Sequence, residues 1–190
     1  MKIFYDVDTQ NDFMNKDGAL YVPNAELIKP NLKLLTDFAR KNKILIIGSL
    51  DKHFGIEEYR EREGELARWG GPFPDHCMAG TFGQKKIQET NQESSQGFFF
   101  EKQSYDVFTN PLISKFLKES KIAEAVVYGV ATDYCVKAAV LGMQQRGIQC
   151  YVIEDAIKGV FPESTKSALE EMIKAGAKFV TTKQVIERKI

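Results

Sequence analysis

The chain has 190 residues, 43% of them hydrophobic, so it is long enough to bury a full core as one domain spanning 1–190. Its 26 basic residues balance its 26 acidic ones, which argues against nucleic acid or an anionic membrane as a partner and favours small molecules. Its three cysteines, with no basic segment and apolar core at the N-terminus, predict a reducing compartment, by default the cytoplasm.

Short apolar runs alternate with helical patterns along the chain, which is typical of a parallel sheet with crossover helices. The predicted strands are 2–7, 43–48, 97–101, 125–130, 149–153 and 178–180. The predicted helices are 30–40, 111–119, 133–146, 162–175 and 182–189. The sequence therefore predicts an α/β fold, a doubly wound (Rossmann-like) six-stranded parallel sheet with helices on both faces.

One irregular stretch, at about 50–96, interrupts this alternation. It contains a Gly-Gly-Pro-Phe-Pro segment, many charged residues and both histidines of the chain. We interpret it as a long excursion from the sheet rather than as a second domain. Loops of this length in compact domains are usually functional or disordered.

Polar residues follow the ends of four predicted strands. Asp8 follows the first strand, Asp51 and His53 the second, Lys102 the third and Cys135 the fourth. In an open parallel sheet, ligands bind in the crevice at the carboxyl ends of the strands. We therefore expect these side chains to converge on one site.

Cys135 is placed to be a nucleophile, because it follows an apolar strand and opens a helix for which Thr132 or Asp133 is the expected N-cap. Unpaired backbone N–H groups and the helix macrodipole favour a thiolate at such a position. The alternative is a small buried hydrophobic residue, which is how we interpret Cys77 and Cys150.

A thiol nucleophile needs a base for its proton and a cation for its charge, and Asp8 and Lys102 can supply them. A neighbouring lysine would keep Asp8 ionised and lower the pKa of the Cys135 thiol. Asp8 alone fits a turn cap, and Lys102 alone fits a solvated strand end. The prediction therefore depends on the three residues together.

The two histidines indicate a metal site. His53 lies two residues after Asp51, so in extended backbone both side chains point to the same side, and His76 can bring a third ligand. The alternatives are two surface histidines or a structural zinc completed by Cys77. We favour an open catalytic site, and its nitrogen and oxygen donors do not choose among zinc, iron and manganese.

In this order the motifs resemble those of the isochorismatase-like cysteine hydrolases, and within them the nicotinamidases, also called pyrazinamidases. The resemblance covers essentially the whole chain. Its motifs are Asp8-Thr-Gln-Asn-Asp-Phe13, Asp51-Lys-His53, Pro74-Asp-His76-Cys-Met-Ala-Gly-Thr81, Lys102, and Gly129-Val-Ala-Thr-Asp-Tyr-Cys135.

The resemblance implies a cysteine amidohydrolase that converts nicotinamide to nicotinate and ammonia through a thioester. It implies a cis peptide between Val130 and Ala131, and an oxyanion hole made by the N–H groups of Ala131 and Cys135. It implies one divalent ion, with zinc preferred and iron or manganese as alternatives, to which the pyridine nitrogen binds. The implied catalytic triad is Asp8, Lys102 and Cys135, and the implied metal ligands are Asp51, His53 and His76.

Aromatic side chains are expected to hold the pyridine ring, with ordinary core packing as the alternative for each of them. The candidates are Phe13 and Trp69, and then Tyr105 and Tyr134. The family gives no firm oligomeric state, and a homo-oligomer is only a family-level expectation.

The chain departs from the family pattern at the fourth metal ligand, which many members place after the Asp-x-His motif as a histidine or glutamate. Residues 54–68 contain no histidine. Water can complete the shell, or one of five glutamates can: Glu57, Glu58, Glu61, Glu63 or Glu65.

Three rival functions follow from the same residues. Another small amide or ureido compound can be the substrate. Isochorismatase activity, which cleaves a vinyl ether, gives the predicted metal ligands no role. A non-catalytic small-molecule-binding module is disfavoured because no Gly-x-Gly-x-x-Gly follows a strand.

Overall fold

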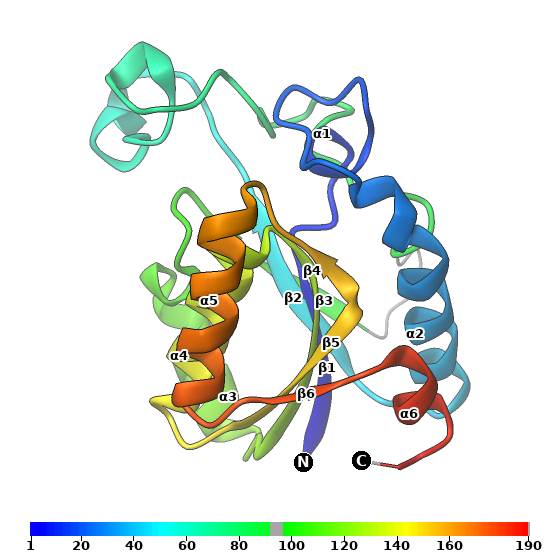
Figure 1. Ribbon diagram of the computed structural model, residues 1–190. Coiled ribbons are helices and arrows are strands. Elements are labelled where there is room, and N and C mark those ends of the chain that lie inside the picture. Colours follow the sequence, from blue (N-terminus) through cyan, green and yellow to red (C-terminus); the bar gives the residue numbers. More distant parts are fainter. Residues whose placement is uncertain (92–96, 190) are drawn as a thin grey trace.

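The computed structural model describes residues 1–91 and 97–189. Within them, six parallel strands form one sheet in the order β3-β2-β1-β4-β5-β6 (Figure 1). The predicted doubly wound α/β fold is thereby confirmed. The strands are β1 Lys2–Val7, β2 Ile46–Asp51, β3 Gly97–Lys102, β4 Glu124–Val130, β5 Gln149–Lys158 and β6 Lys178–Val180.

Helices cover both faces of the sheet. Helices α3, α4 and α5 lie on one face, and α2 and α6 lie on the other (Figure 1). Their bounds, with the short α1, are α1 Asn11–Met14, α2 Lys29–Lys41, α3 Pro111–Glu119, α4 Lys137–Gln144, α5 Pro162–Lys174 and α6 Thr182–Ile186. Among the described residues, no helix combines the length and apolar character that crossing a membrane requires.

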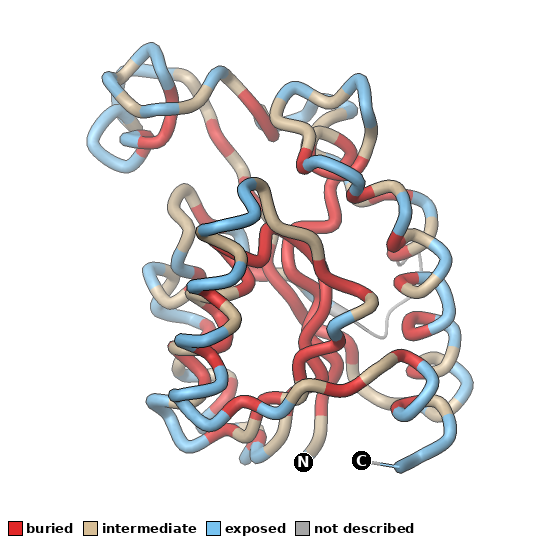
Figure 2. The backbone as a smooth tube through the Cα atoms, in the orientation of Figure 1, coloured by how far each residue is buried: buried red, intermediate tan, exposed pale blue. Residues whose placement is uncertain are grey.

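The strands are buried on both faces, as Figure 2 shows, which explains why they are nearly continuous apolar runs. Along β1, Ile3, Tyr5 and Val7 enter the core beneath α3 to α5, and Phe4 enters the core beneath α2. This alternation follows from the two-residue period of a strand.

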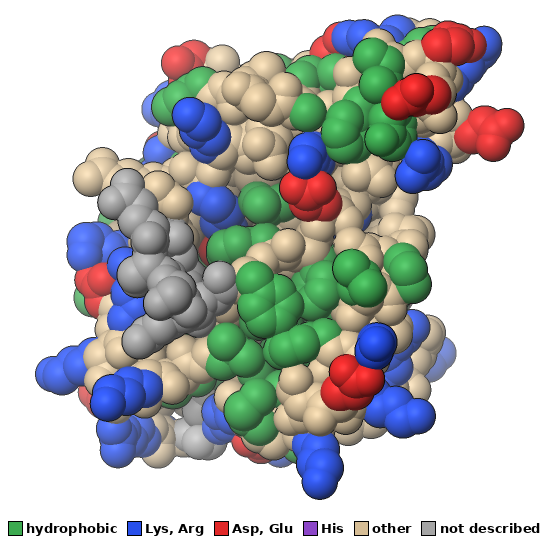
Figure 3. Space-filling model, turned by 180° about the vertical axis from the view of Figure 1, so that it is seen from behind, with side chains coloured by type: hydrophobic (Ala, Val, Ile, Leu, Met, Phe, Trp, Pro, Cys, Tyr) green, Lys and Arg blue, Asp and Glu red, His purple; other side chains and the backbone are tan. Residues whose placement is uncertain are grey.

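On the face shown in Figure 3, basic and acidic side chains are mixed rather than gathered by sign.

The strand order places a ligand crevice between β1 and β4. The chain winds outward from β1 to β3 and then returns to add β4 on the other side of β1. Such a reversal is where open α/β sheets bind ligands. Gly129 lets the strands approach closely here, because a Cβ on it would lie 2.0 Å from the Val7 carbonyl oxygen.

Two predicted boundaries were wrong in an informative way. The strand predicted at 43–48 is β2, three residues later, because the backbone N–H of Ile44 still bonds the Ala39 carbonyl at the end of α2. The helix predicted at 133–146 begins instead as a π-helical turn, Thr132–Val136, before α4. Asp51 is therefore the last residue of its strand rather than a residue beyond it.

The predicted excursion is irregular over its described part. Between β2 and residue 91 it contains two short 3-10 turns, Glu57–Arg62 and Ala67–Trp69. Its last five residues, 92–96, lie outside the described residues. The part that carries these two 3-10 turns stands over the carboxyl ends of the strands (Figure 1).

Candidate active site

The three side chains expected to perform catalysis lie together at the carboxyl end of the sheet. Lys102 Nζ lies 2.9 Å from Asp8 Oδ2 and 3.4 Å from Cys135 Sγ. The residues come from the ends of β1 and β3 and from the turn after β4. All three are buried, with Asp8 fully inaccessible and Cys135 7% exposed. The ammonium of Lys102 therefore bridges the carboxylate and the sulfur.

Backbone conformation directs two of these side chains. Asp8 has a φ of 46°, which turns the chain sharply at the end of β1. The turn that carries Cys135 is tied to the start of α5 by Asp133, whose carboxylate accepts hydrogen bonds from the N–H groups of Val160 and Phe161. Asp133 is therefore not the predicted N-cap of its own helix. That position belongs to Ala131, which makes no side-chain cap.

The Cys135 thiol is not activated in the way its position at a helix start predicts. Burial raises its pKa well above the ordinary value, Lys102 opposes this, and the negative charges of Asp8 and Asp51 add to it. Burial lowers the pKa of Lys102, but Asp51, Asp8 and Cys135 outweigh burial and raise it. These surroundings favour the thiol form of Cys135 and the ammonium form of Lys102.

The peptide bond between Val130 and Ala131 is cis, as the resemblance implies. Both Ala131 and Cys135 border the cavity into which the thiol opens. The carbonyl of Ala131 accepts from the N–H groups of Tyr134 and Val136 and so fixes the turn. The two residues expected to form an oxyanion hole therefore lie at one cavity.

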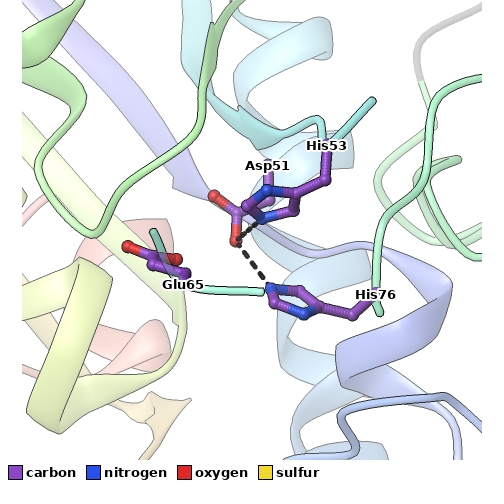
Figure 4. A group of neighbouring side chains, drawn as sticks. All are labelled: Asp51, His53, Glu65 and His76. Carbon is purple, nitrogen blue, oxygen red and sulfur yellow. Dashed lines mark ion pairs between the residues drawn. The ribbon is translucent and has the colours of Figure 1, made fainter. Parts of the chain in front are cut away.

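A second cluster of polar side chains adjoins the first. Asp51 Oδ2 lies 3.9 Å from His53 Nε2 and 3.7 Å from His76 Nε2. Glu65 joins them, and one ligand atom from each of the four residues lies within 4.8 Å of the others (Figure 4). The structure thus brings together the three predicted metal ligands and one of the five candidate glutamates.

These four residues fit a divalent metal ion. Two imidazoles and two carboxylates are a donor set that zinc, iron and manganese accept. His53 Nε2 is buried and has no hydrogen-bond partner in the described part of the chain. His76 Nδ1 donates to the Pro74 carbonyl at 2.7 Å, which leaves Nε2 of that ring free for a metal.

The charged groups of this cluster shift one another's pKa values. Burial raises the pKa of Asp51, but Lys102 and the two histidines outweigh it and hold that pKa well below the usual range. Burial, and then the charge of Asp51, raises the pKa of Glu65 to about 7. A bound cation would favour the ionised form of Glu65. Lys102 also donates to Asp51 Oδ1, so it contacts both clusters.

The excursion is held over the sheet by side chains that follow β1. The Gln10 carboxamide accepts from the Asp51 N–H and donates to the Asp51 carbonyl, each at 2.8 Å. Asp12 Oδ2 accepts from the Cys77 N–H at 2.7 Å. His53 pairs through its backbone with residues 77 and 79, which brings the two histidine rings to 4.6 Å between centroids. The first motif thus supports the metal ligands as well as supplying Asp8.

The cavity beside Cys135 is lined mainly by apolar and aromatic side chains. Three of the four predicted aromatic residues border it: Phe13, Tyr105 and Tyr134. Asp51, Glu65 and His76 border the same cavity, so both clusters face it. Residues that the sequence reasoning missed are Leu20, Tyr21, Val22, Phe73 and Val160.

Trp69 does not border this cavity, and Phe73 occupies that side instead. Leu66 and Phe73 pair with each other in parallel, and Trp69 lies in the loop between them. Arg60 lies over the Trp69 ring at 5.5 Å. Phe73 meets the rings of His76, Tyr105 and Tyr134 edge to face. The closeness of Phe73 to His76 in the sequence was the available signal.

The chain is similar to known proteins along most of its length. The family model described as Isochorismatase domain matches residues 6–184. The nicotinamidase of Escherichia coli is 31% identical in an alignment that covers 92% of this chain and 92% of that protein. The nicotinamidase/pyrazinamidase of Mycobacterium tuberculosis is 25% identical, over 95% of this chain and 98% of that protein.

A solved structure agrees with these relatives. The pyrazinamidase of Pyrococcus horikoshii in complex with zinc superposes with a TM-score of 0.84 at 30% identity, covering 95% of this chain and 98% of that chain. The match of the family model to nearly the whole chain is sufficient to assign it. This chain belongs to the isochorismatase domain family.

Proposed function

We propose that this protein is a metal-containing nicotinamidase that hydrolyses nicotinamide to nicotinate and ammonia through a thioester on Cys135. The observation that carries the proposal is one cavity bordered by the thiol on one side and by metal-ligand side chains on the other. A carboxamide can lie at the sulfur while the ring nitrogen of the same molecule faces the ligands. The relatives named as nicotinamidases support this substrate.

In the first half of the reaction, Asp8 accepts the thiol proton and the Cys135 sulfur attacks the carboxamide carbon. The oxyanion is held by the N–H groups of Ala131 and Cys135. One such donor is typically worth about 3 kcal/mol in the transition state. Asp8 then gives the proton to the departing ammonia, and the C–N bond breaks. Lys102 remains charged and holds Asp8 beside the sulfur.

In the second half, water attacks the thioester carbon while Asp8 takes its proton. The C–S bond breaks, Asp8 returns the proton to the sulfur, and the nicotinic acid formed gives its own proton to the solvent and leaves as nicotinate. One water is consumed and one ammonia released, so the cycle closes with the thiol restored. The raised pKa of Cys135 makes the sulfur a good acceptor of that proton.

We assign Asp51, His53 and His76 as the ligands of one divalent ion, with Glu65 as the fourth. Zinc is the first choice, supported by the zinc complex of the Pyrococcus horikoshii protein, and iron and manganese are the alternatives. When bound, the ion supplies a Lewis acid for the pyridine nitrogen. Phe13, Phe73, Tyr105 and Tyr134 then pack against the ring.

The test is ammonia release from nicotinamide by the wild-type protein, Cys135→Ala and Asp8→Asn. The wild type should release ammonia and both variants should not. Equal activity, or equal inactivity, of all three proteins would remove the amidase proposal. Pyrazinamide, benzamide and a ureido compound are run beside nicotinamide. Faster hydrolysis of the ureido compound than of nicotinamide would favour the rival substrate class. Hydrolysis of benzamide as fast as that of nicotinamide would show that the ring nitrogen has no role in binding.

Two further expectations remain predictions. The reducing compartment is inferred from the cysteine count alone. The cytoplasm is the compartment we expect on that ground. A homo-oligomer is expected only from the family, and sedimentation of the purified protein would test it.

A further inference from the structure

Two buried glutamates of the excursion have different surroundings. Glu65 is one of the four candidate metal ligands. Glu63 is not one of the four, and it contacts the Nδ1 side of the His53 ring. Glu63 Oε2 is 2.5 Å from His53 Nδ1, and Glu63 Oε1 accepts from the Phe54 N–H at 3.1 Å. The Glu63 side chain is fully inaccessible to solvent. Its carboxylate is therefore committed to one ring nitrogen and one backbone amide.

We propose that Glu63 is a positioning residue for the metal centre, which holds the His53 ring with its proton on Nδ1 and with Nε2 directed at the other ligands. The inference rests on the metal site of the proposed function. A metal on Nε2 leaves Nδ1 as an N–H donor, and an anionic acceptor there makes the ring a stronger ligand. The buried, unpartnered state of His53 Nε2 fits this assignment.

The other imidazole is supported in a different way, which gives an internal comparison. His76 Nδ1 donates to the Pro74 carbonyl, a neutral acceptor that no side-chain substitution removes. His53 depends on a charged side chain ten residues away in the sequence. Substitution of Glu63 should therefore weaken one ligand and leave the other unchanged.

Burial also makes the contact between Glu63 and His53 costly to break. An ionised carboxylate away from water is costly unless its oxygens are hydrogen-bonded. The Phe54 N–H satisfies one oxygen of Glu63, and only a donor at His53 Nδ1 satisfies the other among the contacts in the described residues. Each group thus fixes the orientation of its partner.

The experiment measures zinc affinity by competition with a chelator, using protein first stripped of metal. Glu63→Ala should raise the dissociation constant for zinc roughly 10- to 100-fold. Glu63→Gln should give a smaller increase, because its amide oxygen can still accept from Nδ1 without the charge. The matched control is Glu61→Ala, an exposed glutamate in the same segment, whose zinc affinity should equal that of the wild type.

A spectroscopic measurement covers the case in which Glu63→Ala does not fold. The chain has only two histidines, so NMR can assign the ring N–H proton of each in the zinc-loaded protein. The His53 proton should shift in Glu63→Gln while the His76 proton stays in place. Wild-type affinity in a folded Glu63→Ala, or an unmoved His53 proton in Glu63→Gln, would overturn the proposal.

These outcomes are separable from failure of the proposed function. A wild-type protein that binds no zinc, iron or manganese would remove the metal site itself, and this inference with it. A wild-type protein that binds metal as tightly as its Glu63 variants would remove the role of Glu63 alone. Neither measurement depends on which amide the enzyme hydrolyses.

Discussion

The three side chains proposed for catalysis and the four proposed as metal ligands are supported differently. Asp8, Lys102 and Cys135 lie at or just beyond the ends of β1, β3 and β4, so the hydrogen-bonded sheet largely fixes where they meet. Among the metal ligands only Asp51 belongs to a strand. The others belong to the excursion, where individual side-chain hydrogen bonds take over the role of the sheet.

This difference predicts that the metal site and the triad respond differently to substitutions. A hydrogen bond contributes about 1 kcal/mol net, so a site held by a few of them can shift when one is lost. A site at the ends of packed parallel strands should change little unless its own side chains change. Substitutions outside the reacting groups should therefore affect metal binding before they affect the triad.

The largest effect is expected for Cys135→Ala, which removes the nucleophile. The rate of ammonia release should fall by roughly 10⁴- to 10⁶-fold, as for nucleophile removal in other hydrolases. Zinc content should remain that of the wild type, because Cys135 is not among the ligands. Loss of zinc from this variant would mean that the two regions are not separately supported.

Lys102→Met tests the one side chain that contacts both regions. It leaves Asp8 and Asp51 buried without their cation, which should cost about 3–5 kcal/mol in the free energy of unfolding. The loss of unfolding free energy, measured by urea denaturation, should be larger in metal-stripped protein than in zinc-loaded protein. The reason is that a metal ion on Asp51 offsets the missing charge of Lys102. An equal loss with and without zinc would contradict this account.

Gln10→Leu tests the support of the excursion. The change leaves the backbone N–H and carbonyl of Asp51 buried without partners, at a cost of about 1–3 kcal/mol. Zinc affinity should fall in a chelator competition, and the thiol should still react with an alkylating reagent at the wild-type rate. Gln84→Ala is the control, because Gln10 bonds only the backbone carbonyl of that residue. Equal zinc affinity in both variants would show that the Gln10 contacts do not matter.

The smallest effects distinguish two aromatic side chains of the excursion. Phe73→Leu should raise KM for nicotinamide by roughly 2- to 10-fold, since an aromatic contact is worth about 0.5–1.5 kcal/mol. Trp69→Leu should leave KM unchanged, because Trp69 lies away from the cavity. Steady-state kinetics check both, and a larger effect at Trp69 would reverse their assignment.

The sheet and the meeting of Asp8, Lys102 and Cys135 could be predicted because strand periodicity and the strand-end rule are local signals with a fixed spatial meaning. The exact extent of β2 could not be predicted, because the backbone N–H of Ile44 still bonds the Ala39 carbonyl of α2. The lowered pKa expected for Cys135 was also wrong. Burial and two carboxylates, which only the assembled fold brings together, outweigh the position in the chain.

The excursion was the least predictable region. Five glutamates were candidates for one ligand position, and only folding separates Glu65 in the cluster from Glu63 behind it. Trp69 and Phe73 lie close in the sequence, yet the loop that ends where Phe73 pairs with Leu66 brings only Phe73 to the cavity. Composition and spacing cannot distinguish such neighbours, because the choice depends on how the backbone bonds of the loop between them form.

The position of Lys102 has a consequence for how such a site can change. A single ammonium serves two acids and a sulfur, so a gain or loss of charge at any one of them alters its attraction to the others. The nucleophilic and ligand-holding parts of the pocket cannot be exchanged independently between proteins. Any redesign of one part has to rebalance the electrostatics of the other.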